Sequence, residues 1–282
     1  MCQSYPPVHL SALHVYPVKS CRGLSVTTAG LSDHGFVGDR NFMVVAEADG
    51  RFLTQRTHPL MALIETSLTP DSLVLSSPKR RAVTVPLNAS AGLRRVTVWK
   101  STVTADDCGD EAAEWLSAFL GSPLRLVRIG GTYQRPNLKP AAQAGDVVSF
   151  ADSCPFLLVS EASLADLNDR LVARDEEALP MNRFRPNLVV SGCAPFAEDT
   201  WGHVKIGSAI FRSAGPCSRC PITTTDQLTA ARGKEPLRTL ATYRRDPDDP
   251  TDVIFGVNFI HETKQGTVKV GDPVTPLSGG AR

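Results

Sequence analysis

The sequence predicts a mainly β or α+β protein in two β-barrel-like parts, with only a few short helices. Apolar segments are short and often alternate with polar residues, as in strands that bury one face. Glycine and proline, 21 of each, mark turns between these segments. Helical segments do not alternate regularly with strands, which disfavours a parallel sheet of the Rossmann type.

The first part, residues 1–128, is predicted to be a small β-rich domain closed by one helix. Residues 8–20 alternate in polarity and should form a strand that ends near Pro17. Residues 39–56 are typical of a hairpin with an Asp-Gly turn. Residues 109–121 should form the helix, with acidic opening turns, an apolar face and a terminal glycine cap. Further short strands are expected at 71–77, 82–87 and 94–99.

The second part, residues 129–282, begins with a polar segment rich in glycine and proline, 129–145. We interpret it as a linker or an active-site loop. A loop and strand over 146–160 should lead into a helix over 160–173 that Ser160 caps. A short helix is expected over 235–245, with a proline near its first turn. Strands are expected at 185–192, 201–215, 253–262 and 266–277.

Composition narrows the class of protein. The 30 Lys and Arg residues nearly balance the 29 Asp and Glu residues, so no global field attracts nucleic acid or a membrane surface. The first residues do not resemble a signal peptide, and no apolar run approaches the roughly 20 residues that cross a bilayer. We therefore expect a cytoplasmic protein with no nucleic-acid or membrane partner, whose seven cysteines are reduced.

The segment PCSRCPITTTD, residues 216–226, carries Cys217 and Cys220 with Arg219 between them. Structural zinc and iron–sulfur sites usually need four ligands, and no second cysteine or histidine pair is present. A redox dithiol usually begins a helix, which the β-branched run after the pair disfavours, but this alternative stays open. The other possibility is one thiolate, favoured by Arg219, on a soft metal that a cofactor largely holds.

Three polar segments near strand ends are candidate handles for the phosphate of such a cofactor. Lys19 and Ser20 precede a glycine, Arg40 begins a strand, and residues 182–187 hold two arginines between two asparagines. Each of these residues, taken singly, is equally compatible with an ordinary surface position. The pattern alone does not show that they converge.

Nine motifs, in order, closely resemble MOSC-domain proteins of the amidoxime-reducing-component type, including the YcbX-like bacterial branch. The resemblance covers about residues 8–275. The motifs are YPVKSCRG, GDR-F-VV, DCGDEAAEWL, SEASLADLN, FRPNLVVSG, EDTW, PCSRC-ITT-D, KEPLRTL-TYR and GTVKVGDPV. One departure is Pro221, which stands beside Cys220 where the relatives carry isoleucine and removes a backbone N–H there.

The resemblance implies an N-terminal MOSC-associated β-barrel, a MOSC domain, and binding of the molybdenum cofactor, a pyranopterin whose dithiolene sulfurs hold the metal. It implies that Cys220 is the protein's metal ligand and that Lys19, Ser20 and Arg40 contact the cofactor's phosphate end. We also expect Asp152 to donate a proton or contact the substrate, Cys217 to be a small buried residue, and the threonines to continue as a strand. The other implied cofactor-site residues are Ser153, Arg185, Asn187, Ser218 and Arg219.

The implied activity is reduction of N-hydroxylated compounds, such as amidoximes, hydroxylamines and N-hydroxylated bases, by oxygen removal at molybdenum. The alternative is a cofactor carrier or sulfur-handling protein without that turnover, because a fold does not fix an activity. Some relatives carry a C-terminal ferredoxin domain, whose cysteine run is absent from these 282 residues. We therefore expect an external electron donor, such as a ferredoxin or a flavin reductase system.

Overall fold

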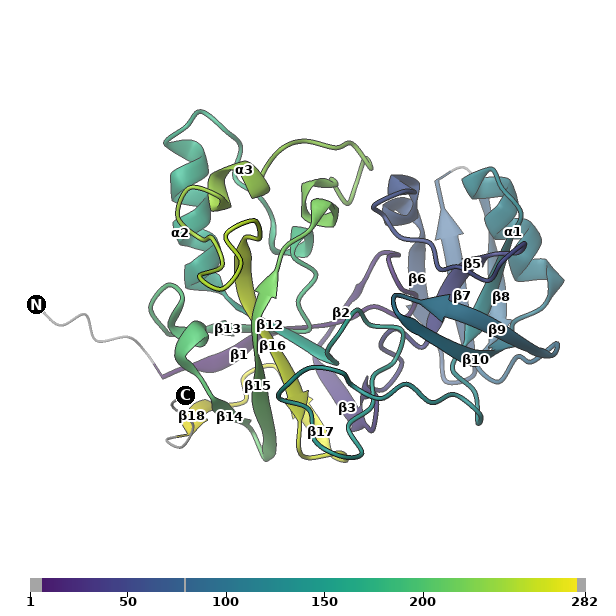
Figure 1. Cartoon of the computed structure of the whole chain (residues 1–282), viewed down its shortest axis with the longest axis horizontal. Coiled ribbons are helices and arrows are strands. Elements are labelled where there is room, and N and C mark those ends of the chain that lie inside the picture. Colours follow the sequence, from purple (N-terminus) through teal and green to yellow (C-terminus); the bar gives the residue numbers. More distant parts are fainter. Residues whose placement is uncertain (1–6, 79, 278–282) are drawn as a thin grey trace, which may run out of the picture.

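The computed structural model describes residues 7–78 and 80–277 and confirms the mainly β fold with few helices. The chain forms two lobes side by side (Figure 1). The first lobe contains α1 and strands β5 to β11, and the second contains α2, α3 and the other strands. None of the helices in the described ranges is long and apolar enough to cross a membrane.

The first lobe consists of two antiparallel sheets closed by α1. One sheet has the order β5 (Phe42–Ala46), β11 (Leu124–Arg128), β10 (Ser101–Asp107) and β9 (Leu93–Val98). The other has β6 (Glu65–Leu68), β7 (Ser72–Ser77) and β8 (Arg80–Pro86), preceded by the 3-10 helix η1 (Pro59–Leu63). The helix α1 (Asp110–Leu120) buries Ala112 and Leu116 in the core between the sheets, and Gly121 caps it in a left-handed conformation, as predicted.

An eight-stranded sheet forms the centre of the second lobe, and only its β12–β13 pair is parallel. The 3-10 helices η2 (Met181–Arg183), η3 (Ala197–Thr200) and η4 (Pro221–Thr224) flank it. Its order is β18 (Val274–Leu277), β14 (His203–Ile206), β15 (Ala209–Ser218), β16 (Ile254–His261), β12 (Phe156–Ser160), β13 (Leu188–Ser191), β1 (His9–Val15) and β2 (Leu24–Val26). A smaller sheet contains β17 (Thr267–Lys269), β3 (Thr28–Ser32) and β4 (Gly35–Phe36).

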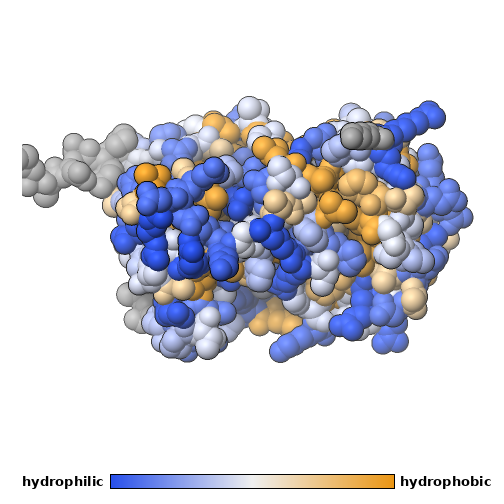
Figure 2. Space-filling model, turned by 90° about the horizontal axis from the view of Figure 1, so that it is seen from above, coloured by the Kyte–Doolittle hydropathy of each residue, from blue (hydrophilic) through white to orange (hydrophobic). Residues whose placement is uncertain are grey.

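Two helices cover one side of the large sheet. Ser160 caps α2 (Glu161–Val172) by accepting the Ser163 N–H, as predicted. The helix α3 (Leu237–Leu240) is shorter than the expected segment. Apolar residues of both helices share a core with β12 and β16. From above, the lobe with α2 and α3 is mostly hydrophilic, whereas apolar residues gather toward the other lobe (Figure 2).

Contacts cross the predicted domain boundary at residue 128 in both directions. Strands β1, β2 and β3 precede it, yet they pair with strands of the second lobe. Tyr133 and Phe150 follow it, yet they pack in the core of the first lobe. The segment 16–22 runs from the second lobe into the first, where Val18 and Cys21 are buried. The boundary itself stays a prediction, and the crossing segment carries Lys19 and Ser20 to the junction.

One local prediction holds only in part, and another was wrong. In the hairpin over 39–56, Phe52 pairs with Val45 across the turn, but only β5 is long enough to form a strand. The threonines after Cys220 form η4, not a strand. Pro221 occupies its first turn, and the hydroxyls of Thr223 and Thr224 bond to carbonyl oxygens three residues back. Such local hydrogen bonds outweigh the strand preference of β-branched residues.

Two β-bulges shape the sheet just before the cysteine pair. Gly215 on β15 and Gly256 on β16 lie at register shifts and have φ of 89° and 75°. Bulges bend a strand and turn its side chains, and they are common beside functional sites. A Cβ atom on Gly256 would lie 2.8 Å from the Leu158 carbonyl oxygen and 2.7 Å from a Val159 methyl carbon. Only glycine fits there without displacing β12.

We expect Gly256→Ala to destabilise the protein by about 2 kcal/mol or more, because left-handed backbone strain and a steric clash act together. Urea denaturation measures the loss. The matched control is Gly145→Ala, at φ 89° with no heavy atom within 4 Å of the added Cβ. It should lose only the conformational part, about 1 kcal/mol. Equal losses in the two variants would contradict the steric argument.

Candidate functional site

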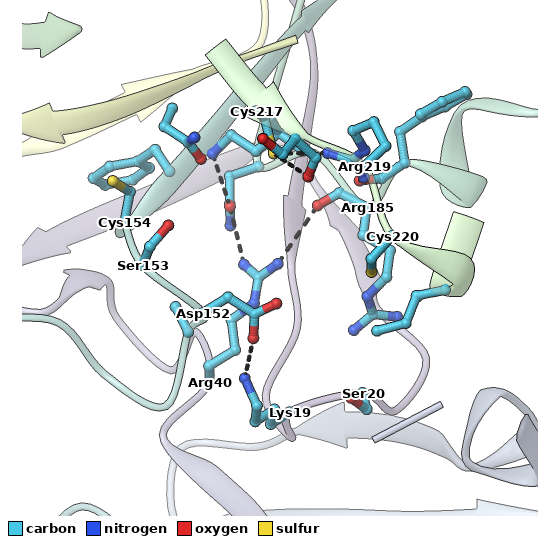
Figure 3. A pocket seen from close by; sticks show the side chains of 18 of the residues that line it. Lys19, Ser20, Arg40, Asp152, Ser153, Cys154, Arg185, Cys217, Arg219 and Cys220 are labelled. Carbon is cyan, nitrogen blue, oxygen red and sulfur yellow. Dashed lines mark hydrogen bonds and ion pairs between the residues drawn. The ribbon is translucent and has the colours of Figure 1, made fainter. Parts of the chain in front are cut away.

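A cavity of about 430 Å³ lies where the two lobes meet, and it brings together all ten predicted site residues. They are Lys19, Ser20, Arg40, Asp152, Ser153, Arg185, Asn187, Ser218, Arg219 and Cys220. Figure 3 shows Lys19 and Asp152 facing each other on one side and Cys217 and Arg219 on the other, with Arg40 between them. Residues as far apart in the sequence as Lys19 and Cys220 therefore converge, although their individual roles stay predictions.

Backbone strain is concentrated at this cavity. Seven non-glycine residues in the described ranges have positive φ, and four of them line it: Ser20, Arg40, Trp99 and Arg185. Each costs free energy, and such residues persist where the surrounding structure holds them for a function. Their φ values lie between 51° and 66°. The concentration of strain is independent support for a functional site here.

Lys19 and Asp152 form an ion pair on the first-lobe side. The Lys19 ammonium, only 4% exposed, donates to the Asp152 carboxylate and, at 2.8 Å, to the Phe150 carbonyl oxygen. The Trp99 indole N–H donates to Asp152 Oδ1 at 3.1 Å. Burial tends to raise the pKa of the Asp152 carboxyl, but Lys19 and Trp99 outweigh it and hold that pKa below its ordinary value. Asp152 is therefore ionised, which favours a contact or proton-accepting role over proton donation.

The loop that carries Asp152 and Ser153 is held by Arg135, a residue of the predicted loop 129–145. The Arg135 guanidinium is buried and donates to the carbonyl oxygens of Ser149, Ala151 and Asp152 at 2.8, 2.6 and 2.8 Å. Through these hydrogen bonds, the segment 129–145 holds the backbone of the loop that lines the cavity. Its Lys139 also lines the cavity.

Arg40 is fixed by a buried network that joins both lobes. Its guanidinium donates to Asp39 Oδ2 at 2.6 Å and to Asn187 Oδ1 at 2.9 Å. Asn187, at the start of β13, also donates to the His14 carbonyl oxygen. Asp39 accepts the Tyr16 backbone N–H at 2.8 Å. Asp39 and Asn187 are almost fully buried, so these contacts hold the Arg40 guanidinium in one position.

Arg185 differs from Arg40 because its guanidinium has no hydrogen-bond or ion-pair partner in the part of the chain that the structure describes. Both guanidinium groups lie against the Tyr16 ring, at 4.3 Å from its centroid for Arg185 and 4.4 Å for Arg40. Arg185 therefore faces the cavity with its donors free for a ligand. Arginine donors of this kind suit phosphate and carboxylate oxygens.

The cysteine pair has unequal surroundings. The Arg219 guanidinium donates to Cys217 Sγ at 2.9 Å and to the Phe184 carbonyl oxygen at 2.7 Å. No hydrogen bond from the described residues reaches Cys220 Sγ, and Cys220 lines the cavity at the start of η4 (Figure 3). Arg219 thus contacts the other thiol of the pair. Cys217 is half-buried and hydrogen-bonded, which differs from the small buried residue we expected.

Several lining residues escaped the sequence analysis. They are Arg56, Trp99, Lys139, Cys154 and Asn258, together with apolar residues around them. Burial raises the pKa of the Cys154 thiol to about 11, so that thiol is neutral and inert. Trp99 follows a strand in a segment with no other functional signal, and Arg56 is the last residue of the segment 39–56 that we predicted to form a hairpin. Neither residue lies in a recognisable sequence motif, so only the tertiary structure identifies them as lining residues.

The donor set fits a metal cofactor that bears a phosphate. Cys220 offers one sulfur without a partner, and thiolates are the side-chain ligands that soft metals select. Lys19, Arg40 and Arg185 offer cationic donors in the same cavity. The buried Arg219 Nε has no hydrogen-bond partner within residues 7–78 and 80–277, so a polar group remains to be satisfied beside the cysteines.

Two family models match the chain, the "MOSC N-terminal beta barrel domain" over residues 8–123 and the "MOSC domain" over residues 145–275. The "Mitochondrial amidoxime-reducing component 1" of Mus musculus is 38% identical, with 94% of this chain and 81% of the relative covered. The Homo sapiens protein of the same name is 36% identical, covering 94% and 82%. The "Molybdenum cofactor sulfurase" of Danio rerio is 35% identical over 95% of this chain but only 34% of its own length.

Proposed function

The chain belongs to the MOSC-domain family of the amidoxime-reducing-component type, and from this premise we propose that it is a molybdenum-cofactor-dependent reductase of N-hydroxylated compounds. Its relatives connect it with molybdenum-cofactor chemistry and oxidoreductase activity. One observation supports the finer proposal: the cavity combines a cysteine sulfur and cationic donors that have no hydrogen-bond partner in the described part of the chain. The substrate class is that of amidoximes, hydroxylamines and N-hydroxylated bases.

In this proposal, different residues of the chain bind different parts of the cofactor. Cys220 supplies the thiolate ligand, and Lys19, Ser20, Arg40 and Arg185 hold the phosphate end. Asn187 keeps Arg40 in place, and Ser218, Arg219 and Ser153 surround the cofactor near the cysteines. When bound, the cofactor supplies the two-electron chemistry that removes oxygen from the N–OH group.

Asp152 acts, in this proposal, as an acceptor in the substrate space. Its ionised carboxylate cannot donate a proton at neutral pH, but it can accept a hydrogen bond from the N–OH or NH₂ group of an amidoxime. The Lys19 ammonium stays beside it and balances its charge. The protons that the reaction consumes therefore come from water or from another donor.

The alternative function is a cofactor carrier or a sulfur-handling protein, which the likeness to a molybdenum cofactor sulfurase favours. Both functions require a bound cofactor, and only the reductase turns over substrate. Steady-state reduction of benzamidoxime by the cofactor-loaded protein with an artificial electron donor separates them. Metal and pterin analysis separates both from a metal-free dithiol oxidoreductase.

We expect Cys220→Ala to abolish this reduction, whereas Cys217→Ala keeps most of it. One thiolate completes the metal's coordination, and the other accepts a hydrogen bond from Arg219 beside it. Initial rates and molybdenum content of the two variants provide the measurement. Equal loss of activity in both would favour a dithiol mechanism and exclude this assignment.

We expect Lys19→Ala and Arg40→Ala to lower cofactor occupancy more than the turnover of the cofactor that remains. A charge-assisted hydrogen bond contributes roughly 1.5–3 kcal/mol, so each loss should weaken cofactor binding about ten- to a hundredfold. Molybdenum and pterin per chain measure occupancy, and circular dichroism checks the fold. The exposed Lys100, outside the cavity lining, gives the control Lys100→Ala. Wild-type occupancy with a collapsed rate would show that Lys19 and Arg40 act in the reaction itself.

We further propose that electrons come from a separate iron–sulfur or flavin protein. The 282 residues contain no second cysteine cluster and no glycine-rich nicotinamide or flavin fingerprint. Redox partners usually dock through small interfaces. That the protein resides in the cytoplasm likewise stays a prediction.

The cofactor-loaded protein should give no turnover with NADH or NADPH alone. A ferredoxin with its reductase should restore it, at a rate that falls as salt rises if the docking is electrostatic. Amidoxime reduction and nucleotide oxidation, followed together, provide the measurement. Direct reduction by the isolated chain with NADH would overturn the need for a partner.

A further inference from the structure

The positive charge of the cavity exceeds the negative charge that its own carboxylates and one phosphate group supply. Its six lining cations are Lys19, Arg40, Arg56, Lys139, Arg185 and Arg219. Asp152 pairs with Lys19 and the buried Asp39 pairs with Arg40, which leaves four without a carboxylate partner among residues 7–78 and 80–277. A phosphate monoester adds at most about two negative charges at neutral pH, and the thiolate proposed for Cys220 adds one more. About one positive charge therefore remains for a second anion.

Arg56 and Lys139 are the two of these four cations that the proposed function does not assign to the cofactor, and the Arg56 guanidinium lies on an aromatic ring of the cavity. Arg40 and Arg185 lie on Tyr16, whereas the Arg56 guanidinium lies on Trp99, with its carbon 4.3 Å from a ring centroid. Arg56 Nε is buried and has no hydrogen-bond partner among the residues that the structure describes. A buried donor without an acceptor is costly unless a ligand satisfies it. The planar guanidinium matches the two oxygens of a carboxylate.

Trp99 occupies a backbone position that normally belongs to glycine. Val98 pairs with Ser101, so Trp99 and Lys100 form a two-residue turn between β9 and β10. Trp99 has a φ of 55°, and two-residue hairpin turns favour glycine where φ is positive. The indole is fixed by Phe52, at 4.9 Å between ring centroids, and by its bond to Asp152. A strained tryptophan held in this way, yet 37% exposed, offers a rigid planar surface.

Hydrogen bonds connect the segment that carries Arg56 to the loop after the cysteine pair. The Arg232 guanidinium donates to the Arg56 carbonyl oxygen at 2.6 Å and also to the Gln55 carbonyl oxygen. The buried side-chain amides of Gln55 and Gln227 bond to each other at 3.0 Å. The backbone at Arg56 therefore has a fixed position relative to the second lobe, and the Arg56 guanidinium lies on Trp99, so a ligand does not need to order this segment.

We propose that Arg56 and Trp99 form a substrate subsite that selects planar N-hydroxylated compounds bearing a carboxylate. Trp99 stacks against the flat part of the substrate, and Arg56 binds the carboxylate. The inference rests on the proposed function and narrows its substrate class to anionic aromatic amidoximes and similar compounds. The neighbouring Asp152 carboxylate also attracts Arg56, which helps to lower the pKa of Asp152, but the ion pair with Lys19 balances its charge.

The kinetic test compares 4-carboxybenzamidoxime with benzamidoxime, using the cofactor-loaded full chain. The wild-type protein should prefer the carboxylated substrate in kcat/KM by about tenfold or more, and rising salt should weaken the preference. Arg56→Gln should reduce the ratio of the two kcat/KM values about ten- to a hundredfold, since a charge-assisted hydrogen bond is lost. The control Arg51→Gln, on the exposed Arg51 outside the cavity, should keep the ratio.

A binding test decides the inference even if no turnover is seen. Calorimetry should find that benzoate binds the loaded protein at least tenfold more tightly than its neutral isostere benzamide, and that Arg56→Gln removes this difference. Trp99→Gly, which suits the turn, should weaken both ligands because the planar surface is lost. Equal binding of benzoate and benzamide by the wild-type protein would overturn the inference.

Two further outcomes would also overturn it. If Arg56→Gln lowers molybdenum and pterin content per chain, Arg56 belongs to the cofactor site. If Lys139→Gln, rather than Arg56→Gln, removes the preference for benzoate, the anion binds on the loop 129–145. Failure of the wild-type protein to reduce benzamidoxime counts instead against the proposed function, which keeps the two conclusions separate.

Discussion

The site depends on one buried ion pair, Arg40 with Asp39, and on the amide of Asn187 that completes it. These groups come from the junction of the two lobes, and together they also fix the Tyr16 backbone. Removing one member would leave an uncompensated charge in a nearly water-free place, at a cost of about 3–5 kcal/mol. The pair therefore contributes geometry as much as stability, since it directs one face of a guanidinium into the cavity.

The chain reaches this arrangement by crossing between the lobes early. The segment 16–22 leaves the large sheet after β1, buries Val18 and Cys21 in the first lobe, and returns through β2 and β3. Lys19 is thereby buried at the junction, where carbonyl and carboxylate oxygens replace its water shell. A cation with four flexible methylene groups becomes a fixed donor. Such pre-organisation is what cofactor and substrate binding require of a first contact shell.

In the cysteine motif, the local backbone conformation gives two identical side chains different surroundings. Gly215 and Gly256 introduce bulges just before the pair, and Pro221 begins a 3-10 turn just after it. Between them, Arg219 turns toward Cys217 and leaves Cys220 free at the cavity wall. Within the described residues, one sulfur accepts a hydrogen bond from Arg219 and the other is left for a ligand in the cavity. The backbone therefore gives two residues of the same type unequal surroundings.

Sequence patterns were enough to predict the mainly β class, the helices α1 and α2 with their caps, and the candidate residues around Lys19, Arg40, Arg185 and Cys220. Caps, turn residues and polarity patterns act over a few residues, so they can be recognised without a structure. Only the tertiary structure reveals that these candidates line one cavity, that Arg219 donates to Cys217, and that Arg56 and Trp99 line the same cavity. Those features depend on contacts between residues far apart in the sequence, and strand propensity failed at η4 because hydroxyl-to-carbonyl bonds compete with it.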